Sequence, residues 1–388
     1  MKKHALGKLR MGMVGGGEGS FIGPVHRMAA QLDGRIELVC GAFSSDPERS
    51  RRSGVDLYGL SAASSYADYE QMFAQQAAKP VGERMDFVTI VTPNHLHFPV
   101  AQAALNAGFH VVCDKPVTHR LQDALHLRAL VERTGLHFAV TYNYTGYPMV
   151  QEARELVRSG ALGAIRRINC EYLQGWLAAD LDNKQANWRV DPDQAGVAGC
   201  FSDIGSHAEN LIAYISGEEL DMVAADLNRF VPGRRLDDDG NVLLRFGSGA
   251  RGVMCASQIA VGEENNLHLR IYGEHGSIEW AQMEPNTLLV RLADGSTQVR
   301  RTGSAGVSPA AQSITRLPAG HPEGYLEAFA TVYGRFADAI GSGVASGNRA
   351  VNYPTIDDGV ASLRFISCVV ESSERDGAWV STHEEAAT

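Results

Sequence analysis

Short apolar runs alternate with helical patterns along the chain up to about Tyr142. Four of these runs are rich in β-branched residues and bounded by turn residues, which is typical of buried strands. One of the helical segments between them is rich in alanine and ends at Gly108, which suits a left-handed C-cap. Strands that alternate with helices predict a parallel sheet. The expected strands are 9–14, 36–43, 87–92 and 109–113, and the clearest helices are 23–32 and 97–107.

A different pattern begins after Tyr142. One more helix is expected over 149–159, and a series of strands separated by glycine-containing turns follows it, which predicts an antiparallel sheet. The run 302–313 is rich in Gly, Ser and Ala and is expected to be a loop, whereas 325–340 and 356–373 are helical in pattern. The change of pattern predicts two domains, 1–145 and 146–388. The expected antiparallel strands are 242–246, 253–259, 267–272, 288–292 and 297–301.

The composition favours a globular cytoplasmic protein. The 388 residues allow two or three domains, and 44% of them are hydrophobic, which is enough for large cores. Because no apolar run approaches about 20 residues and the first residues lack a signal-peptide core, neither a membrane span nor secretion is expected. A net charge of -10 argues against a nucleic-acid or anionic-membrane partner. The six cysteines include no C-x-x-C pair, so neither zinc nor a disulfide framework is suggested.

A glycine cluster follows the first expected strand and precedes the first expected helix. Gly15 and Gly17 would let the backbone approach a pyrophosphate, and the helix N-terminus would supply amide donors. The strict G-x-G-x-x-G spacing fails because Ser20 occupies the position of the third glycine, so the turn is lengthened. A purely structural turn is the alternative, but the position at the head of an alternating β/α segment favours dinucleotide binding. The candidate contacts are Gly15, Gly17, Glu18, Ser20, Phe21 and Ile22.

The end of the second expected strand decides between NAD and NADP in many dinucleotide-binding proteins. An NAD site usually has Asp or Glu there to bind the ribose 2′-hydroxyl, whereas this chain has Ser44 and Ser45. These serines and Arg49 would tolerate a 2′-phosphate. The alternative is that Asp46 only caps a helix and Arg49 is solvated. NAD and NADP therefore both remain open as cofactors.

Two further tripeptides follow expected strands. Asp114-Lys115-Pro116 stands at the carboxyl end of one, where open α/β sheets bind their ligands. Proline fixes the local chain, through a cis bond in some proteins, and would aim Lys115 into a cleft. Thr92, Pro93, Asn94 and His97 follow the neighbouring strand and are further candidates for cofactor contacts.

Asp203 and His207 stand four residues apart, on one helix face if the segment is helical. Oxidation of a secondary alcohol needs a hydride acceptor and a base, and histidine suits proton transfer near neutral pH. A lysine ammonium about 4 Å from the developing alkoxide contributes on the order of 4 kcal/mol at an effective dielectric near 20, which would substitute for a metal. The alternative is an N-cap beside a buried structural histidine.

Several aromatic and polar residues resemble the lining of a sugar pocket, in which rings cover C–H faces and polar groups bind hydroxyls. Each of them alone favours a structural role. These candidates are Tyr144, Trp176, Trp188, Arg189, His321 and Tyr325.

These motifs occur together in an order that resembles the glucose-fructose oxidoreductase, inositol dehydrogenase and rhizopine-catabolism (Gfo/Idh/MocA) family, over essentially the whole length. The resemblance implies an N-terminal Rossmann domain and a C-terminal α/β domain with a large open antiparallel sheet, often used for dimer or tetramer assembly. It also implies that Lys115 belongs to a Glu-Lys-Pro motif, in which Asp114 replaces the usual Glu. Asp203 and His207 match the family's acid and general base, and no metal is expected.

The resemblance implies an NAD(P)-dependent oxidoreductase that acts on a secondary hydroxyl of a sugar, sugar derivative or inositol. Trp188 and Arg189 would contact the nicotinamide or the substrate. Lys115, Tyr144, Trp176, Asp203, His207, His321 and Tyr325 complete the expected substrate site. Two alternatives remain open at this point: an NAD-dependent glycosidase that oxidises its sugar only transiently, and a catalytically silent sugar sensor.

Overall fold

The computed structural model describes residues 7–343 and 351–383, which group into two compact units. Unit 1 contains residues 7–143, 329–343 and 351–360, and unit 2 contains residues 144–328 and 361–383. The chain passes between the units inside two long helices, α11 (Tyr325–Ser342) and α12 (Ile356–Glu374). The described residues of 329–360 thus belong with the N-terminal unit, although the sequence pattern assigns them to a domain of 146–388.

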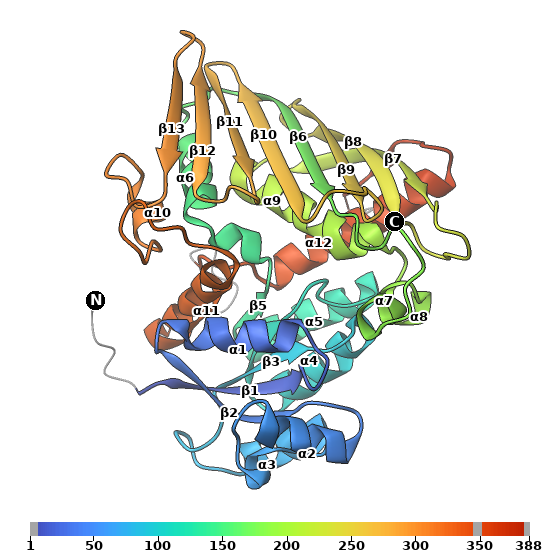
Figure 1. Cartoon of the computed structure of the whole chain (residues 1–388), viewed down its shortest axis with the longest axis vertical. Helices are drawn as coiled ribbons and strands as arrows, with labels where there is room; N and C mark the ends of the chain where they lie inside the picture. The colour runs from blue at the N-terminus through green and yellow to red at the C-terminus, as the bar shows by residue number, and fades with distance from the viewer. Residues whose placement is uncertain (1–6, 344–350, 384–388) are drawn as a thin grey trace. The chain divides into compact units, whose positions relative to one another are not determined.

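Unit 1 is built on a five-stranded parallel sheet with the strand order β2-β1-β3-β4-β5 (Figure 1). All five residues of the central strand β3 are buried, as expected for a parallel strand covered on both faces. The strands are β1 (Leu9–Gly15), β2 (Ile36–Ala42), β3 (Phe87–Val91), β4 (His110–Cys113) and β5 (Phe138–Val140). The helices are α1 (Ile22–Leu32), α2 (Pro47–Asp56), α3 (Tyr69–Ala77), α4 (His97–Asn106) and α5 (Leu121–Thr134), with 3-10 turns η1 (Ala62–Ser64) and η2 (Asn94–Leu96).

The returning part of α11 completes the core of unit 1. Phe336 packs edge-on against Phe87 of β3, with ring centroids 5.3 Å apart, and both rings are fully buried. Burying a phenylalanine contributes about 1.5–3 kcal/mol. The core of unit 1 therefore depends on residues that follow β3 by more than half the chain.

Unit 2 is built on a nine-stranded sheet with the order β13-β12-β11-β10-β6-β9-β8-β7-β14, in which only β6 and β9 pair in parallel. Helices α6, α9 and α12 lie along one face of this sheet (Figure 1). Buried and exposed positions alternate in β8, as expected for a sheet with one covered face. The other face is referred to below as the open face.

The elements of unit 2 begin after a 3-10 turn η3 (Asn143–Gly146). The strands are β6 (Ile165–Leu173), β7 (Leu220–Asn228), β8 (Asp239–Phe246), β9 (Arg251–Ser257), β10 (Asn266–Gly273), β11 (Gly276–Ala281), β12 (Thr287–Leu292), β13 (Thr297–Arg301) and β14 (Val380–Ser381). The helices are α6 (Pro148–Arg158), α7 (Lys184–Arg189), α8 (Pro192–Ala195), the π-helical segment η4 (Phe201–Gly205), α9 (Ser206–Ser216) and α10 (Pro309–Gln312).

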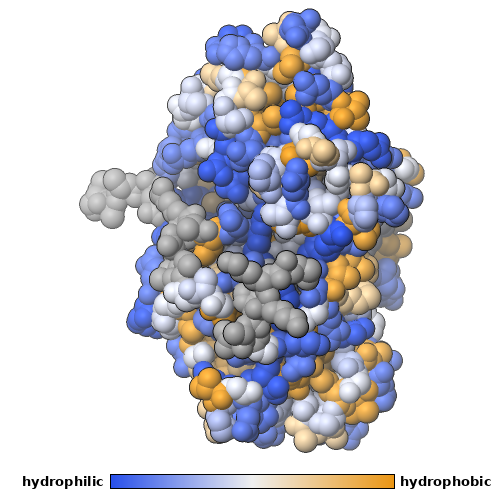
Figure 2. All heavy atoms as spheres, turned by 90° about the vertical axis from the view of Figure 1, so that its left-hand side faces the viewer, coloured by the Kyte–Doolittle hydropathy of each residue, from blue (hydrophilic) through white to orange (hydrophobic). Residues whose placement is uncertain are grey.

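The α/β fold class, with one parallel and one mainly antiparallel sheet, agrees with the sequence prediction. One local expectation was wrong: the run 302–313 is not only a loop, because Ser308 caps the short helix α10 by accepting the N–H of Ala311. In the part of the chain that the structure describes, no helix is long and apolar enough to cross a bilayer. Hydrophilic residues cover most of the face seen in Figure 2, with hydrophobic residues in small groups.

Candidate functional site

The glycine turn between β1 and α1 has the geometry of a phosphate-binding turn. Gly15, Gly16 and Gly19 have φ values of 88°, 77° and 76°, which only glycine adopts readily. A Cβ at Gly23 would overlap the Cα of Gly16, so α1 approaches the turn more closely than a side chain would allow. Because the N-terminus of α1 carries no acidic residue in its first turn, its amides are suited to a pyrophosphate.

The other candidates in this turn either contact neighbouring residues of unit 1 or are exposed. Ser20 accepts the N–H of Gly23 at 3.3 Å, and Ile22 is the first residue of α1. The backbone N–H of Glu18 donates to Ser53 Oγ, and the Glu18 carboxylate pairs with Arg52 at 3.3 Å on the surface. Phe21 is 63% exposed.

The residues after β2 form a helix cap. Asp46 accepts the N–H of Arg49 at 2.7 Å and so begins α2, while Ser44 Oγ accepts the N–H of Asp46. Ser45 and the side chain of Arg49 are exposed. The capping interpretation of this segment is therefore correct as far as the helix is concerned, and the serine hydroxyls remain accessible to a ribose.

Asp114 fixes the backbone that carries Lys115. One carboxylate oxygen, Oδ1, accepts the N–H of Lys115 at 2.9 Å and the hydroxyl of Thr141 at 2.8 Å. The following Lys115–Pro116 bond is cis. The side chain of Asp114 thus fixes the backbone of Lys115 just after the carboxyl end of β4.

A series of buried polar side chains connects Asp114 to the core of unit 1. Its second oxygen, Oδ2, is 3.9 Å from Nε2 of His26, and Nδ1 of His26 is 2.7 Å from the hydroxyl of Tyr333, which contacts Thr89 at 3.0 Å. Burial lowers the pKa of His26 to about 4, although the charge of Asp114 acts in the opposite direction. His26 is therefore neutral near pH 7.

His97 contacts the turns that follow β3 and β4. Its Nδ1 is 2.7 Å from the carbonyl of Pro116, and its Nε2 is 2.9 Å from the carbonyl of Thr92. Thr92, Pro93 and Asn94 form the turn after β3, and Pro116 follows Lys115. The buried ring of His97 thus lies between these two turns and contacts both.

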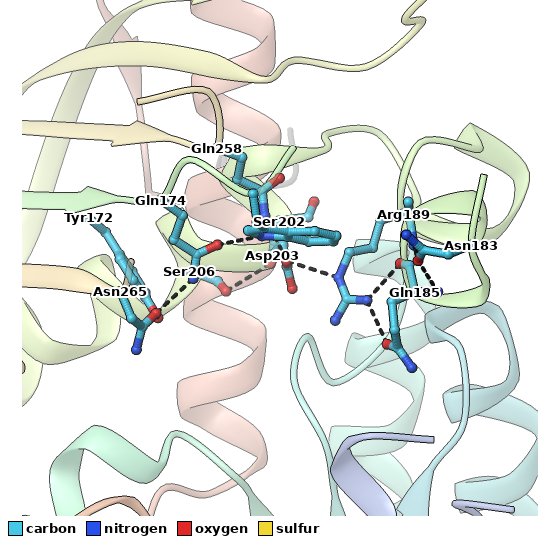
Figure 3. Close-up of polar contacts among 12 residues, drawn as sticks. Tyr172, Gln174, Asn183, Gln185, Arg189, Ser202, Asp203, Ser206, Gln258 and Asn265 are labelled. Carbon is cyan, nitrogen blue, oxygen red and sulfur yellow. Dashed lines mark hydrogen bonds and ion pairs between the residues drawn. The ribbon is translucent and has the colours of Figure 1, made fainter. Parts of the chain in front are cut away.

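In unit 2, Asp203 lies in the π-helical segment η4 with its carboxylate held from two directions (Figure 3). Its Oδ2 accepts Nε–H of Arg189 at 3.0 Å and Nε2–H of Gln258 at 2.9 Å. The guanidinium of Arg189 also donates to Gln185 and lies 4.3 Å from the ring centroid of Trp188. These contacts fix the direction of the Asp203 carboxylate.

His207 is the second residue of α9 and is 8% exposed. Its ring meets the ring of Tyr144 edge-on, with centroids 4.8 Å apart. The hydroxyls of Tyr144 and Tyr172 are 2.6 Å apart, and Asn265 bonds both of them. Burial raises the pKa of both tyrosines, so they are neutral donors and acceptors.

The same network extends to a partly exposed tryptophan. Gln174 donates to Asn265 at 2.7 Å and accepts the indole N–H of Trp176 at 2.9 Å. The ring centroid of Tyr325 is 6.5 Å from that of Tyr144. His321 is exposed and contacts the carbonyl of Pro318, so the structure does not bring it to this cluster through any described contact.

Several residues of the site have no counterpart among the sequence candidates, and they include Thr141, Tyr172, Gln174, Gln258 and Asn265. Gln258 directly follows β9 and Asn265 directly precedes β10, so polar residues at strand ends were the available signal. Among the residues in 7–343 and 351–383, no group of three His, Cys, Asp or Glu side chains could hold a metal ion.

Family comparisons agree with this geometry. The model described as an oxidoreductase family with an NAD-binding Rossmann fold matches residues 9–142, and the model of the GFO/IDH/MocA C-terminal domain matches residues 150–279. Unit 1 therefore contains the NAD-binding Rossmann domain of an oxidoreductase. The chain belongs to the Gfo/Idh/MocA family.

Individual relatives are similar over almost the whole chain. The sequence is 34% identical over 381 residues to the uncharacterized oxidoreductase YfiI of Bacillus subtilis, covering 96% of each chain. The inositol dehydrogenase homologue of Azotobacter vinelandii, solved with NADH and myo-inositol, is 34% identical with a TM-score of 0.90 over 97% of this chain and 98% of that one. Levoglucosan dehydrogenase of Pseudarthrobacter phenanthrenivorans is 26% identical over 398 residues, which is 96% of this chain and 97% of the relative.

Proposed function

We propose that this protein is an NAD-dependent dehydrogenase that oxidises a secondary hydroxyl of a sugar, sugar derivative or inositol. The observation that carries the proposal is the cluster in unit 2, in which neutral tyrosine, asparagine and glutamine side chains surround His207 and Asp203. Such groups bind hydroxyls, and Trp176 offers an aromatic face for a ring. The similarity to an inositol dehydrogenase homologue and to levoglucosan dehydrogenase supports the same substrate class.

In the proposed reaction, His207 accepts the hydroxyl proton as general base and Lys115 stabilises the developing alkoxide. Nicotinamide, when bound, supplies the hydride acceptor. Asp203 positions the reacting groups, and its pairing with Arg189 keeps its carboxylate in one orientation. Asp114 positions Lys115 by accepting its backbone N–H. General base catalysis by a residue such as His207 contributes about 10²–10⁴-fold to the rate.

Unit 1 fits the cofactor at the glycine turn. The three glycines with positive φ and the N-terminus of α1 would hold the pyrophosphate, and Ser44 and Ser45 would contact the adenosine ribose. Because the matching family model is NAD-binding and the inositol dehydrogenase homologue was solved with NADH, we propose that NAD is the main cofactor. The uncharged Ser44 and Ser45 would also tolerate the 2′-phosphate of NADP.

The test measures reduced-nicotinamide absorbance with inositols, hexoses, pentoses, levoglucosan and glycosides, each with NAD and with NADP. We expect turnover with at least one cyclic polyol and NAD. Absence of turnover across the panel, in protein shown to bind NAD, would overturn the dehydrogenase proposal. Cleavage of a glycoside without net reduction would replace it with the glycosidase reaction.

We also propose that the open face of the unit 2 sheet joins copies of this chain into a dimer or tetramer. Leu243 in β8 is 51% exposed on this face. A hollow of about 420 Å³ is lined there by residues that include Asn169, Glu171, Val253, Cys255 and Arg270. An apolar side chain beside a hollow on a broad sheet is suited to a self-complementary interface.

A further inference from the structure

The segment that carries Asp203 and His207 begins at a buried carboxylate from another part of unit 2. Asp237, two residues before β8, accepts the N–H of Gly199 at 2.7 Å through Oδ1 and the N–H of Phe201 at 2.9 Å through Oδ2. Its backbone carbonyl accepts the N–H of Cys200 at 2.9 Å. One residue therefore binds three consecutive amides, of the kind that a helix start leaves without partners inside the helix.

The backbone at the beginning of the 199–207 segment packs closely against Asp237. A Cβ at Gly199 would lie 2.5 Å from the carbonyl oxygen of Asp237, so glycine is what permits the close approach. A Cβ at Gly205 would lie 2.8 Å from the ring of Phe201, which is fully buried. The residues just before the π-helical segment are therefore packed closely against Asp237, and the segment itself has no space for a side chain at Gly205.

The π-helical turn makes the direction of Asp203 depend on where the segment begins. The N–H of Ser206 reaches the carbonyl of Phe201 five residues back, whereas the N–H of Asp203 reaches Gly199 four residues back. The turn thus contains one residue more than an α-helical turn. A different start would rotate Asp203 away from Arg189 and Gln258, and His207 away from the ring of Tyr144.

We propose that Asp237 is a positioning residue for the reaction. Its hydrogen bonds with the amides of Gly199, Cys200 and Phe201 set the directions of the Asp203 and His207 side chains. The catalytic consequence rests on the proposed function, whereas the effect on the segment does not. Burying a carboxylate costs free energy unless donors compensate it, and the two amide N–H groups are the donors here.

Asp238 provides a matched control beside Asp237. Its carboxylate is 1% exposed and also accepts two backbone N–H groups, those of Phe230 and Val231. Those amides belong to a different turn of unit 2, outside the 199–207 segment. The variants Asp237→Asn and Asp238→Asn therefore replace carboxylates at neighbouring buried sites. Asp238 also lies 3.8 Å from the guanidinium of Arg234, and only the carboxylate of Asp237 contacts the segment with Asp203 and His207.

The experiment combines hydrogen exchange with kinetics on the full chain. In Asp237→Asn we expect faster exchange of amides in 199–207, a fall in kcat of about tenfold to a hundredfold, and an NAD Kd within about twofold of the wild-type value. In Asp238→Asn we expect faster exchange around 230–231 and a kcat within about twofold of wild type. If Asp237→Asn does not fold, the same measurements are made on Asp237→Ser, whose hydroxyl oxygen can still accept an amide N–H.

The outcomes separate the two proposals. Equal exchange over 199–207 in both variants, or an equal fall in kcat in both, would overturn the role of Asp237. Unchanged kcat in an Asp237→Asn protein whose segment exchanges faster would also overturn it. If the wild-type protein oxidises no polyol, the proposed function fails, and the exchange result still decides whether Asp237 holds the segment.

Discussion

At the residue scale, two carboxylates of the site are held by donors before any ligand binds. Asp114 is held by the N–H of Lys115 and the hydroxyl of Thr141, and Asp203 is held by Arg189 and Gln258. Fixed charges of this kind need little reorganisation during a reaction, which is the main source of electrostatic catalysis. In the proposed function, the reacting roles belong to Lys115 and His207.

The first prediction concerns those two reacting groups. Lys115→Met and His207→Asn should each lower kcat by about 10²–10⁴-fold, because one removes the charge beside the alkoxide and the other removes the base. The NAD Kd should stay within about twofold of wild type. Steady-state kinetics and NADH titration check this, with Lys79→Met, an exposed lysine, as the control. Loss of NAD binding together with kcat would argue against these roles.

The second prediction follows from the lowered pKa of His26. The folded protein keeps His26 neutral down to about pH 4, whereas the unfolded chain protonates it near 6.5, so the unfolded state binds more protons between these values. The stability that His26 contributes is complete above about pH 6.5 and is lost as the pH falls towards 4. Between pH 8 and pH 5 the loss is about 2 kcal/mol.

Urea unfolding at pH 8 and pH 5 measures this loss. The difference between the two pH values should be smaller by about 2 kcal/mol in His26→Gln than in the wild-type protein. His126→Gln replaces an exposed histidine of α5 and serves as the control. The same pH difference in His26→Gln and wild type would contradict the prediction.

The sequence offered candidates for the reacting groups but none for most of the residues that contact them. Lys115, Asp203 and His207 stand in short recognisable motifs, so they were candidates from the start. Thr141, Gln258 and Asn265 are ordinary polar residues, and they matter because the fold brings each to a specific oxygen. No local pattern contains that information, since the bond from Gln258 to Asp203 spans 55 residues.

At the element scale, the third prediction concerns the contact between α1 and the glycine turn. In Gly23→Ala the new methyl group would overlap Gly16, so α1 must move away from the turn that is to hold the pyrophosphate. We expect the NAD Kd to rise tenfold or more, about 1.4 kcal/mol of binding free energy. Titration of protein fluorescence with NADH measures the change.

Gly34→Ala is the control for this prediction. Gly34 has a φ of 68° with open space around it, so alanine there costs about 1–2 kcal/mol of folding stability through the backbone alone. It should leave the NAD Kd unchanged. Equal Kd values in the two variants would show that the close contact at Gly23 does not matter for NAD binding.

The predictable elements are those with a clear period. The strands of unit 1 are mainly apolar and were recognised, except for the three-residue β5. In unit 2 the strands β6, β7, β11 and the two-residue β14 were missed. The alternation of β6 and β7 is irregular: Arg166 and Arg167 of β6 are both exposed, and three consecutive residues of β7 are buried. The π-helical turn at Phe201 was not predictable, because its start depends on Asp237, which lies 36 residues further along the chain.

At the scale of the whole molecule, the fourth prediction concerns assembly. Leu243→Arg places a charge at an exposed apolar position of the open face and should shift the protein towards the monomer. Sedimentation velocity over a range of concentrations measures this. Val81→Arg changes an equally apolar and 85% exposed residue of unit 1 and should leave the assembly unchanged. A monomeric wild-type protein, or an unchanged oligomer in Leu243→Arg, would contradict the proposal.

The division into units was the part of the global fold that the sequence pattern described least well. Helical periodicity over 325–340 shows that one face of the helix is buried, but not which core buries it. Phe336 packs with His110 and His137, and Tyr353 packs with His137, so the core that buries this helix is set by contacts between residues 199 to 226 positions apart. Such contacts are properties of the folded chain and leave no local trace.

The discontinuity of unit 1 also affects the order of events during synthesis. The parallel sheet emerges from the ribosome with residues up to 143, but Phe329, Tyr333 and Phe336 follow only after segment 144–328 has been made. At about 5–20 residues per second this takes on the order of 10–40 s. During that interval Phe87 and His26 lack the aromatic partners that cover them in the finished protein, and the nascent sheet is a natural substrate for chaperones that bind exposed apolar surface.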